Sequence, residues 1–332
     1  MKKVLSGFIV LGALGFAASS RAACDLPVAS AGFGTATSFA VNSTISSTST
    51  NVNVNCGAGN LLSLLSSNNI TIRLASASNV SGTRGTMKRA GDTSTDNIPV
   101  QLCTTATCAT EMTIGATAIT YSSSQLLNLV GLLGGLNFSI PVYLRTVPGQ
   151  VVAAGTYTVT LNVAVTYRIC TGLAVGGLLC LSGQDQNGSG TVPITVTMTV
   201  TNDCTTITAP NISFGSAPLV SSFSTVSQTI SVVCTKGSSY TVGLSNGSNP
   251  ANGVRNMISS AGNRLSYDIY KGSSTTSRWG PSSTERVSST DSNPIAGDGT
   301  TRVFSYTAKV LTTQNTPVAG NYSDNVVVDL SF

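Results

Sequence analysis

The feature that most constrains the fold of this chain is a set of landmarks that occurs twice in the same order. In each copy a cysteine is followed by a Phe-Gly pair and then by a second cysteine, which ends an alternating apolar stretch. The landmarks are Cys24, Phe33-Gly34 and Cys56 in the first copy, and Cys204, Phe214-Gly215 and Cys234 in the second. We therefore expect two domains with one fold.

The rest of the chain keeps the two copies in step and predicts strands. Ile70–Leu74 corresponds to Tyr240–Leu244, Met87 to Met257, and Gly155-Thr156-Tyr157 to Gly320-Asn321-Tyr322. Short alternating stretches separated by Gly, Ser and Asn turns, without helical periodicity, are typical of antiparallel sandwiches. The predicted fold class is all-β, with two immunoglobulin-like antiparallel β-sandwich domains.

The first residues have the pattern of a secretory signal peptide. Lys2 and Lys3 precede an apolar run, and Ser20-Arg21-Ala22 resembles a cleavage site with small residues. We expect a signal peptide at residues 1–22, a first domain at 23–201 and a second domain at 202–332. No other run is long enough for a membrane helix.

All eight cysteines follow this signal, and an even number in an exported protein predicts disulfides. The parallel between the copies favours Cys24–Cys56 and Cys204–Cys234. We expect Cys170–Cys180 to stiffen a loop and Cys103–Cys108 to hold a hairpin turn. A zinc site is the alternative for the last two pairs, but the chain has no histidine and no paired C-x-x-C motif, so we predict no metal site.

The two copies differ at their ends. Thr191–Thr201 alternates apolar residues with threonine and predicts a seventh strand for the first copy. The second copy ends with the alternating segment Tyr322–Phe332, so we expect its sandwich to lack a final strand. Such a sandwich exposes unpaired backbone groups and an apolar groove, which a strand from another chain could fill. The predicted groove residues are Tyr322, Val326, Val328, Leu330 and Phe332.

The second copy resembles a spore coat protein U domain. The resemblance rests on its NDC, ISFG, VVC, RLSYDIYKGSSTTSRWG and AGNYSDNVVVDLSF segments and covers Asn202–Phe332 well, whereas the first copy is a more divergent relative. Such domains are subunits of archaic chaperone–usher pili. The resemblance implies a sandwich without its final strand, a periplasmic pilus chaperone, an outer-membrane usher, and a donor strand from the next subunit as partners.

The family normally carries a donor segment before its first cysteine. Here we expect the mature chain to begin one residue before Cys24, with nothing to donate. A subunit that accepts but does not donate belongs at one end of a fibre. This chain is therefore similar to the two-domain tip adhesins of such pili, which pass through the periplasm to the pilus tip at the cell surface.

Leucine is combined with glycine in three segments of the first copy that lie between predicted strands, here called the leucine-rich segments: Gly59–Ser66, Gln125–Leu136 and Gly172–Leu179. Loops between strands run over the surface, and exposed apolar patches mark interaction sites. We predict that these segments are exposed loops that bind a hydrophobic abiotic or host surface and support biofilm formation. Buried plugs or short core helices are the alternative. The predicted contact residues are Leu61, Leu62, Leu64, Leu65, Leu126, Leu127, Leu129, Val130, Leu132, Leu133, Leu136, Leu173, Val175, Leu178 and Leu179.

Other function classes fit the composition less well. Only 9% of residues are charged, and Lys2, Lys3 and Arg21 of the signal supply much of the +5 net charge, so we expect no nucleic-acid binding. Without histidine, Ser–His and Cys–His catalysis are impossible, so we predict neither an enzyme nor a cofactor. A glycan-binding adhesin and a non-adhesive pilus or coat subunit remain alternatives. The sole tryptophan, Trp279, lies in the second copy and is expected in the core or at the groove rim.

Overall fold

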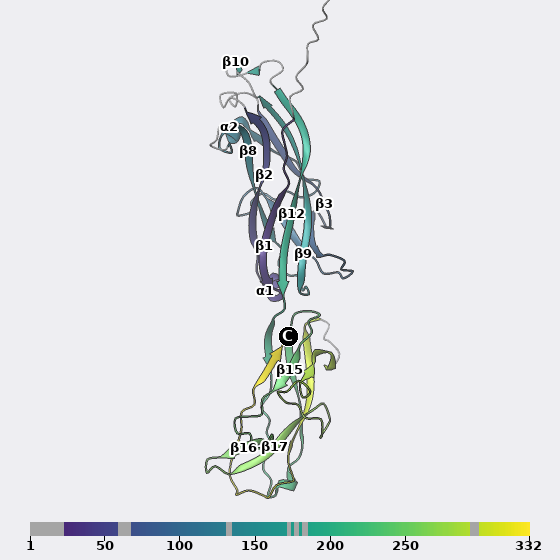
Figure 1. Ribbon diagram of the computed structural model, residues 1–332, viewed down its shortest axis with the longest axis vertical. Coiled ribbons are helices and arrows are strands. Elements are labelled where there is room, and N and C mark those ends of the chain that lie inside the picture. The colour runs from purple at the N-terminus through teal and green to yellow at the C-terminus, as the bar shows by residue number, and fades with distance from the viewer. Residues whose placement is uncertain are drawn as a thin grey trace, which may run out of the picture.

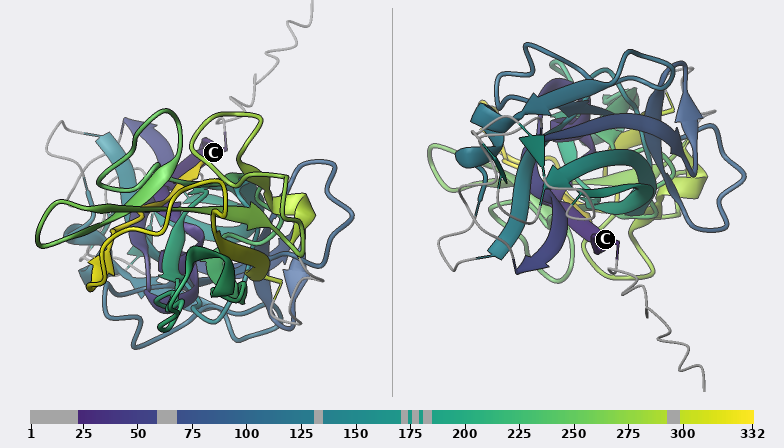
Figure 2. Two further views of the ribbon diagram at one scale, coloured as in Figure 1. Left: turned by 90° about the horizontal axis from the view of Figure 1, so that it is seen from below. Right: turned by 90° about the horizontal axis from the view of Figure 1, so that it is seen from above.

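The computed structural model describes residues 23–58, 68–130, 135–170, 174–175, 179–180, 185–292 and 299–332. Within these residues the chain forms two β-sandwiches, stacked end to end along the long axis of the molecule (Figure 1). In the views along that axis, the two sandwiches overlap (Figure 2). The predicted fold class, two immunoglobulin-like sandwiches, is confirmed.

The first sandwich has two layers, which β5 and β9 join. One layer contains β2, β8, β6 and β5, with β4 at its side, and the other contains β1, β12, β9, β3 and β7. A short helix, α1 (Ser38–Ser43), follows β1, and α2 (Ser123–Leu127) follows β7. The strands are β1 (Ala29–Thr37), β2 (Ser47–Ala58), β3 (Asn69–Ala77), β4 (Val80–Ser81), β5 (Arg84–Arg89), β6 (Ile98–Cys103), β7 (Ile119–Ser122), β8 (Gly135–Thr146), β9 (Gly155–Cys170) and β12 (Asp185–Thr201).

The strand expected at Thr191–Thr201 is the second half of β12. It pairs with β9 antiparallel as far as Val200 and with β1 parallel. Its side chains alternate, so that Val192, Ile194 and Val196 are fully buried while Thr195 is exposed. Burial of a branched apolar side chain contributes about 1.5–3 kcal/mol, so β12 supplies a large part of this core.

The second sandwich repeats this plan with fewer strands. One sheet has the order β13-β14-β19-β17-β16-β20, and the other has the order β18-β15-β21. Its strands are β13 (Cys204–Thr208), β14 (Val226–Cys234), β15 (Thr241–Leu244), β16 (Arg255–Ser259), β17 (Arg264–Lys271), β18 (Val287–Ser288), β19 (Thr301–Val310), β20 (Tyr322–Ser323) and β21 (Val328–Ser331), with 3₁₀ turns at Val220–Ser222 and Ser289–Asp291.

The sulfur atoms pair as the sequence predicts: Cys24 with Cys56, Cys103 with Cys108, Cys170 with Cys180, and Cys204 with Cys234. In each sandwich, one bridge connects the start of the domain to the end of its second long strand. No described helix has the length and apolar character needed to cross a membrane.

A short joint connects the two bodies. β12 ends at Thr201 and β13 begins at Cys204, so two residues separate the two sheets. Lys236, in the turn after β14, forms an ion pair with Asp96 of the first sandwich. The Asp96 carboxylate is almost fully buried and also accepts a hydrogen bond from the Ala153 backbone at 2.9 Å. The joint therefore has a polar contact besides the connecting chain.

Candidate functional site: an open groove and a distal end

The end of the second copy follows the same ladder as β9. In the first sandwich Tyr157 of β9 lies opposite Arg89 of β5, and Val163 opposite Leu74 of β3. In the second, Tyr322 lies opposite Ser259 of β16, and Val328 opposite Leu244 of β15. These pairs agree residue for residue when Gly155-Thr156-Tyr157 is aligned with Gly320-Asn321-Tyr322. β20 and β21 are therefore the counterpart of β9.

The two sandwiches differ on the outer edge of this strand. β9 has β3 on one side and β12 on the other, whereas β21 is the last strand of its sheet within the described residues. Each backbone N–H and C=O group is a strong hydrogen-bonding group, and an unpaired edge is a template for another strand. The second sandwich thus lacks, in the described part of the chain, a counterpart of β12.

A groove lies where that counterpart would pack. Two adjoining hollows of about 480 and 420 Å³ share Ile212, Phe214, Met257 and Tyr322 in their walls. Val326 and Val328 form one side of the second hollow, and core residues of both layers form its floor. The remaining apolar floor residues are Ile230, Leu244, Tyr267, Ile269 and Tyr306.

The opposite wall corresponds to β1. In the first sandwich β1 pairs with β12, and its register shifts between Gly32 and Thr35, around Phe33-Gly34. The matching pair Phe214-Gly215 lies in the groove wall, and Gly34 and Gly215 share a φ of +73°. Left-handed backbone favours glycine, which explains why the Phe-Gly landmark occurs twice. The sequence pattern contained this signal, but the wall residues were not among the predicted groove residues.

The terminal segment is not the single strand that the alternation predicts. It consists of β20 and β21, with Asp324–Val327 between them, and the two strands pair with different sheets. The Asp324 carboxylate accepts hydrogen bonds from the Tyr267 hydroxyl and the Ser248 backbone, each at 2.8 Å. These contacts hold the segment where it passes between the sheets. β9 makes the same passage without a break because β12 pairs with it throughout.

The predicted groove residues have different outcomes. Tyr322, Val326, Val328 and Leu330 are half-buried and pack against the core of the second sandwich. Phe332 is 61% exposed and lies beyond β21, with its ring 6.1 Å from that of Tyr240. It does not line either hollow.

A separate feature of the molecule is the distal end, away from the second sandwich. Figure 1 shows α2 and the short strand β10 (Ala174–Val175) at this end. Asn68 connects the bases of the segments there: its side chain accepts a hydrogen bond from Cys170 N at 2.7 Å, and its carbonyl accepts one from the Ser123 hydroxyl at 3.0 Å. The strand ends that flank the leucine-rich segments therefore meet at one end of the sandwich.

The second leucine-rich segment is not an exposed loop over the part that the structure describes. Leu126 of α2 and Leu136 of β8 are fully buried, and Leu129 and Val130 pack against the core. The exposure prediction is wrong for Leu126 and Leu136, because α2 turns the Leu126 side chain inward and Leu136 belongs to the buried face of β8. Leu127, on the other side of α2, is 41% exposed.

The remaining predicted contact residues are not tested. Val175 and Leu179 face each other in the two-residue ladder of β10 and β11 (Leu179–Cys180), and their side chains are outside the described set. The other residues lie outside the described ranges altogether: Leu61, Leu62, Leu64, Leu65, Leu132, Leu133, Leu173 and Leu178.

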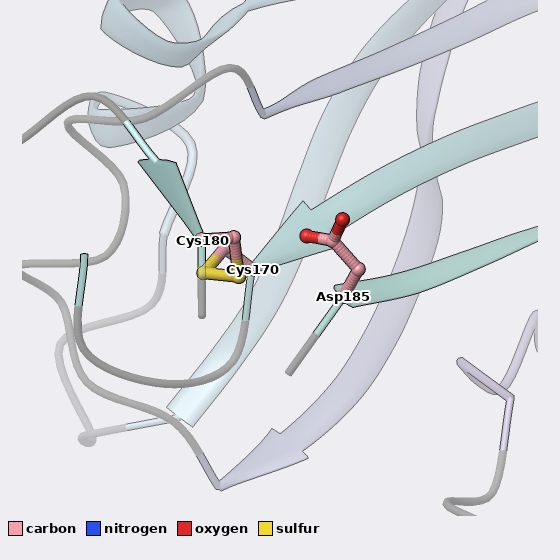
Figure 3. A group of neighbouring side chains, drawn as sticks. All are labelled: Cys170, Cys180 and Asp185. Carbon is pink, nitrogen blue, oxygen red and sulfur yellow. A yellow bond between two sulfur atoms is a disulfide. The ribbon is translucent and has the colours of Figure 1, made fainter. Parts of the chain in front are cut away.

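The third leucine-rich segment begins and ends at a disulfide. Figure 3 shows Cys170 and Cys180 bonded to each other, beside the carboxylate of Asp185. These three residues are close enough together to suggest a metal site. A thiolate is the form of cysteine that binds metal, and both sulfurs are consumed by the disulfide. Asp185 instead forms an ion pair with Arg168 at 3.3 Å.

Comparison with known proteins identifies the family. The model of the Spore Coat Protein U domain matches residues 11–164 and again residues 190–329, one match for each copy. The chain belongs to this family. No curated protein sequence matches it.

A solved structure shows the same fold. The chain is similar to the structure of the CsuC–CsuE chaperone–tip adhesion subunit pre-assembly complex from archaic chaperone–usher Csu pili of Acinetobacter baumannii. The identity is 24%, the TM-score is 0.55, and the match covers 93% of this chain and 100% of the other. The CupB6 tip adhesin from Pseudomonas aeruginosa is more distant, with 11% identity, a TM-score of 0.37 and 89% of each chain covered.

The position of Trp279 bears on the glycan-binding alternative. The Trp279 side chain is fully buried in the second sandwich, and its Nε1–H donates to the Val242 carbonyl at 2.9 Å. Its ring packs against Phe304 and Tyr306. A sugar platform needs an accessible aromatic face, which this ring does not offer. Trp279 is thus a core residue, as one of the two sequence-based expectations had it.

Proposed function

We propose that this spore coat protein U family member is the tip adhesin of a chaperone–usher pilus. The observation that carries the proposal is the repeated ladder: β20 and β21 reproduce β9, while the strand equivalent to β12 is missing from the described residues. An unpaired strand edge beside an apolar groove favours completion by a strand from another chain. The likeness in fold to a chaperone-bound tip subunit supports this proposal.

The proposed partners follow from the groove. A periplasmic chaperone occupies it first, an outer-membrane usher receives the complex, and the donor strand of the next subunit then replaces the chaperone. The first sandwich already contains β12 and has no corresponding open edge beside β9. In this proposal the first sandwich presents its distal end, and the chain lies at the pilus tip on the cell surface.

The proposed adhesive surface is the apolar part of the distal end. Leu127 is its exposed member within the described residues, and the leucine-rich segments outside them complete it. Each leucine that leaves water contributes up to about 1.5–3 kcal/mol, and many fibres acting together multiply weak contacts by avidity. Such a tip binds hydrophobic abiotic or host surfaces without a specific pocket and promotes biofilm formation.

Attachment assays test this surface. The variant Leu127→Ser/Leu132→Ser/Leu133→Ser is expected to lower cell attachment to polystyrene severalfold with piliation unchanged. Leu126→Ser is the matched control, because Leu126 is buried and its loss acts on folding. It should lower the amount of assembled tip rather than the attachment per pilus. Undiminished attachment by the triple variant contradicts the adhesive surface.

Immunogold labelling tests the location. An antibody against the first sandwich is expected to place gold particles only at the free end of each fibre. Labelling along the fibre shaft would instead support the non-adhesive subunit alternative.

A further inference from the structure

The cis strand β12 shows what a strand in the empty position must provide. Its inward-facing residues lie directly opposite the inward-facing residues of β9. Aligning β9 with β20 and β21 gives the corresponding residues of the second sandwich. These are the residues that an incoming strand would face. Along β12 the inward residues are Gly188, Gly190, Val192, Ile194, Val196 and Met198, opposite Tyr167, Val165, Val163, Leu161, Val159 and Tyr157. The counterparts of the latter are Phe332, Leu330, Val328, Val326, Asp324 and Tyr322.

One position in this row changes character. Val159, which is buried opposite Val196, corresponds to Asp324 in the second sandwich. A second position changes with it: Val100 of β6, buried in the same core as Val159, corresponds to Tyr267 of β17, whose hydroxyl donates to Asp324. Two apolar residues of the first core thus correspond to a hydrogen-bonded carboxylate and phenol in the second sandwich. Asp324 lines the groove beside Tyr322 and Val326.

The electrostatics around Tyr267 favour its role as the donor to Asp324. Burial raises the pKa of the Tyr267 phenol, and its hydrogen bond to the Asp324 carboxylate raises that pKa further, with the Arg255 guanidinium acting in the opposite direction. The phenol therefore stays protonated and donates. The other groups that face the carboxylate are the backbone N–H of Ser248 and the Asn249 amide, 3.5 Å away.

A strand that covers this groove must satisfy the carboxylate. A carboxylate has about four acceptor positions, and the contacts named above leave part of this capacity to water. An apolar side chain placed over Asp324 would exclude that water without replacing it, and dehydrating a charge is costly unless it is hydrogen-bonded. In the first sandwich the same position holds Val196, which leaves space for a side chain of valine size.

We propose that the strand received by the second sandwich carries a small hydrogen-bond donor, serine, threonine or asparagine, at the position facing Asp324. Large apolar residues occupy the inward positions that face Tyr322, Val326 and Val328. This inference rests on the proposed function, because it assumes that another chain supplies the strand. Asp324 then selects the register of the donor: a slip of one inward position would place an apolar side chain on the carboxylate.

Peptides derived from β12 test the proposal. The probe is a synthetic Asp185–Thr201 peptide carrying a fluorophore, titrated against the purified full chain and followed by fluorescence anisotropy. We compare the natural peptide with Val196→Thr, which places a hydroxyl opposite Asp324, and with Ile194→Thr, which places one opposite Val326. The Val196→Thr peptide is expected to bind about tenfold tighter than the natural peptide or better, since a hydrogen bond to a charged group is the stronger kind. The Ile194→Thr peptide is expected to bind more weakly.

The chain variant Asp324→Val supplies the reciprocal test. It should bind the natural peptide more tightly than the Val196→Thr peptide, which reverses the preference. Tyr267→Phe, which removes one hydrogen bond from the carboxylate and keeps the ring, should enlarge the preference for threonine. This second variant decides the question if Asp324→Val does not fold.

The outcomes separate the two proposals. Equal affinity of the natural and Val196→Thr peptides, or a preference unaffected by Tyr267→Phe, overturns the role of Asp324 and leaves strand acceptance intact. Failure of every peptide to bind overturns strand acceptance itself, and with it the proposed function.

Discussion

At the scale of single residues, the second sandwich depends on a network of polar groups in its interior. Arg255 is fully buried, forms an ion pair with Asp268, and donates to the carbonyls of Ser245 at 2.8 Å and Trp279 at 2.8 Å. Burial lowers the pKa of the Arg255 guanidinium, and the negative charge of Asp268 opposes that effect. The network connects β16, β17 and the loop that carries Trp279, and it fixes their arrangement.

Removing this guanidinium is expected to destabilise the second sandwich strongly. Arg255→Met leaves buried carbonyls without donors and one side of Asp268 unpaired, which costs about 3–5 kcal/mol. Urea unfolding followed by tryptophan fluorescence measures this loss in the free energy of unfolding. Because Trp279 is the sole tryptophan, the signal reports on this sandwich alone. Arg264→Met is the control, because Arg264 is exposed, and its cost should stay within about 0.5 kcal/mol. Equal costs for the two variants would contradict the network.

The first sandwich should have an acid-sensitive loop. The backbone and side chain of Ser94 hydrogen-bond to Asp92 and, with Arg89, lower the pKa of its carboxyl from 3.8 to about 2. A carboxyl with a depressed folded pKa stabilises the protein above its unfolded pKa, and this contribution is lost as the pH falls. Thermal unfolding followed by circular dichroism should show this loss of stability as the pH falls from about 4 to about 2. The melting temperature of Asp92→Asn should depend less on pH over the same range. An unchanged pH dependence in the variant would rule this loop out as the cause.

At the residue scale, the sequence predicted which side chains face inward where a segment follows the two-residue period of a strand. The alternation of Tyr322, Val326, Val328 and Leu330 predicted their inward positions, because strand geometry alone sets that period. It could not predict Leu126, since α2 spans five residues and is too short to display a helical period. Nor did it predict Asp324, because a polar residue inside an alternating segment looks the same whether it faces water or a buried phenol.

At the scale of elements, β12 explains why one strand is continuous in the first copy and divided in the second. It pairs with all sixteen residues of β9, and that strand is continuous, whereas its counterpart is divided into β20 and β21. The sequence predicted β12 itself, since its alternation is regular. It could not predict the division of the terminal segment, because that depends on a partner strand being present.

The burial of β12 leads to a paired prediction. Ile194→Ala should destabilise the first sandwich by about 2–5 kcal/mol, because the Ile194 side chain is fully buried. Thr195→Ala, at the adjacent exposed position, should cost no more than about 0.5 kcal/mol. Urea unfolding followed by circular dichroism gives both values. If the two costs were alike, β12 would not be part of the core.

At the scale of the whole molecule, the direction of the chain agrees with assembly into a fibre. β12 runs from the distal end to the joint and leads directly into the second sandwich. Figure 1 shows the C-terminus beside this joint, so β20 and β21 run towards it. A strand antiparallel to them, as β12 is to β9, would run away from the joint. The next subunit would then follow the second sandwich as the second follows the first.

The joint itself is expected to be stiffened by Lys236 and Asp96. Lys236→Met leaves the nearly buried Asp96 carboxylate without its cationic partner, so the spread of angles between the sandwiches should widen. Small-angle X-ray scattering should then show a broader distribution of interatomic distances. The control is Lys309→Met in β19, away from the joint, which should leave the distribution unchanged. An unchanged distribution for Lys236→Met would show that the two-residue connection suffices.

The most direct test of the central claim, that the second sandwich receives a strand from another chain, is hydrogen–deuterium exchange along Val326–Ser331. The exchange of this segment is compared between the isolated chain and the chain in assembled fibres, with β9 as the internal reference. The amides of this segment that do not bond to β15 are expected to exchange rapidly in the isolated chain and to become as protected as those of β9 in the fibre. Equal exchange in the two states would mean that no strand pairs with this edge, and would contradict the account.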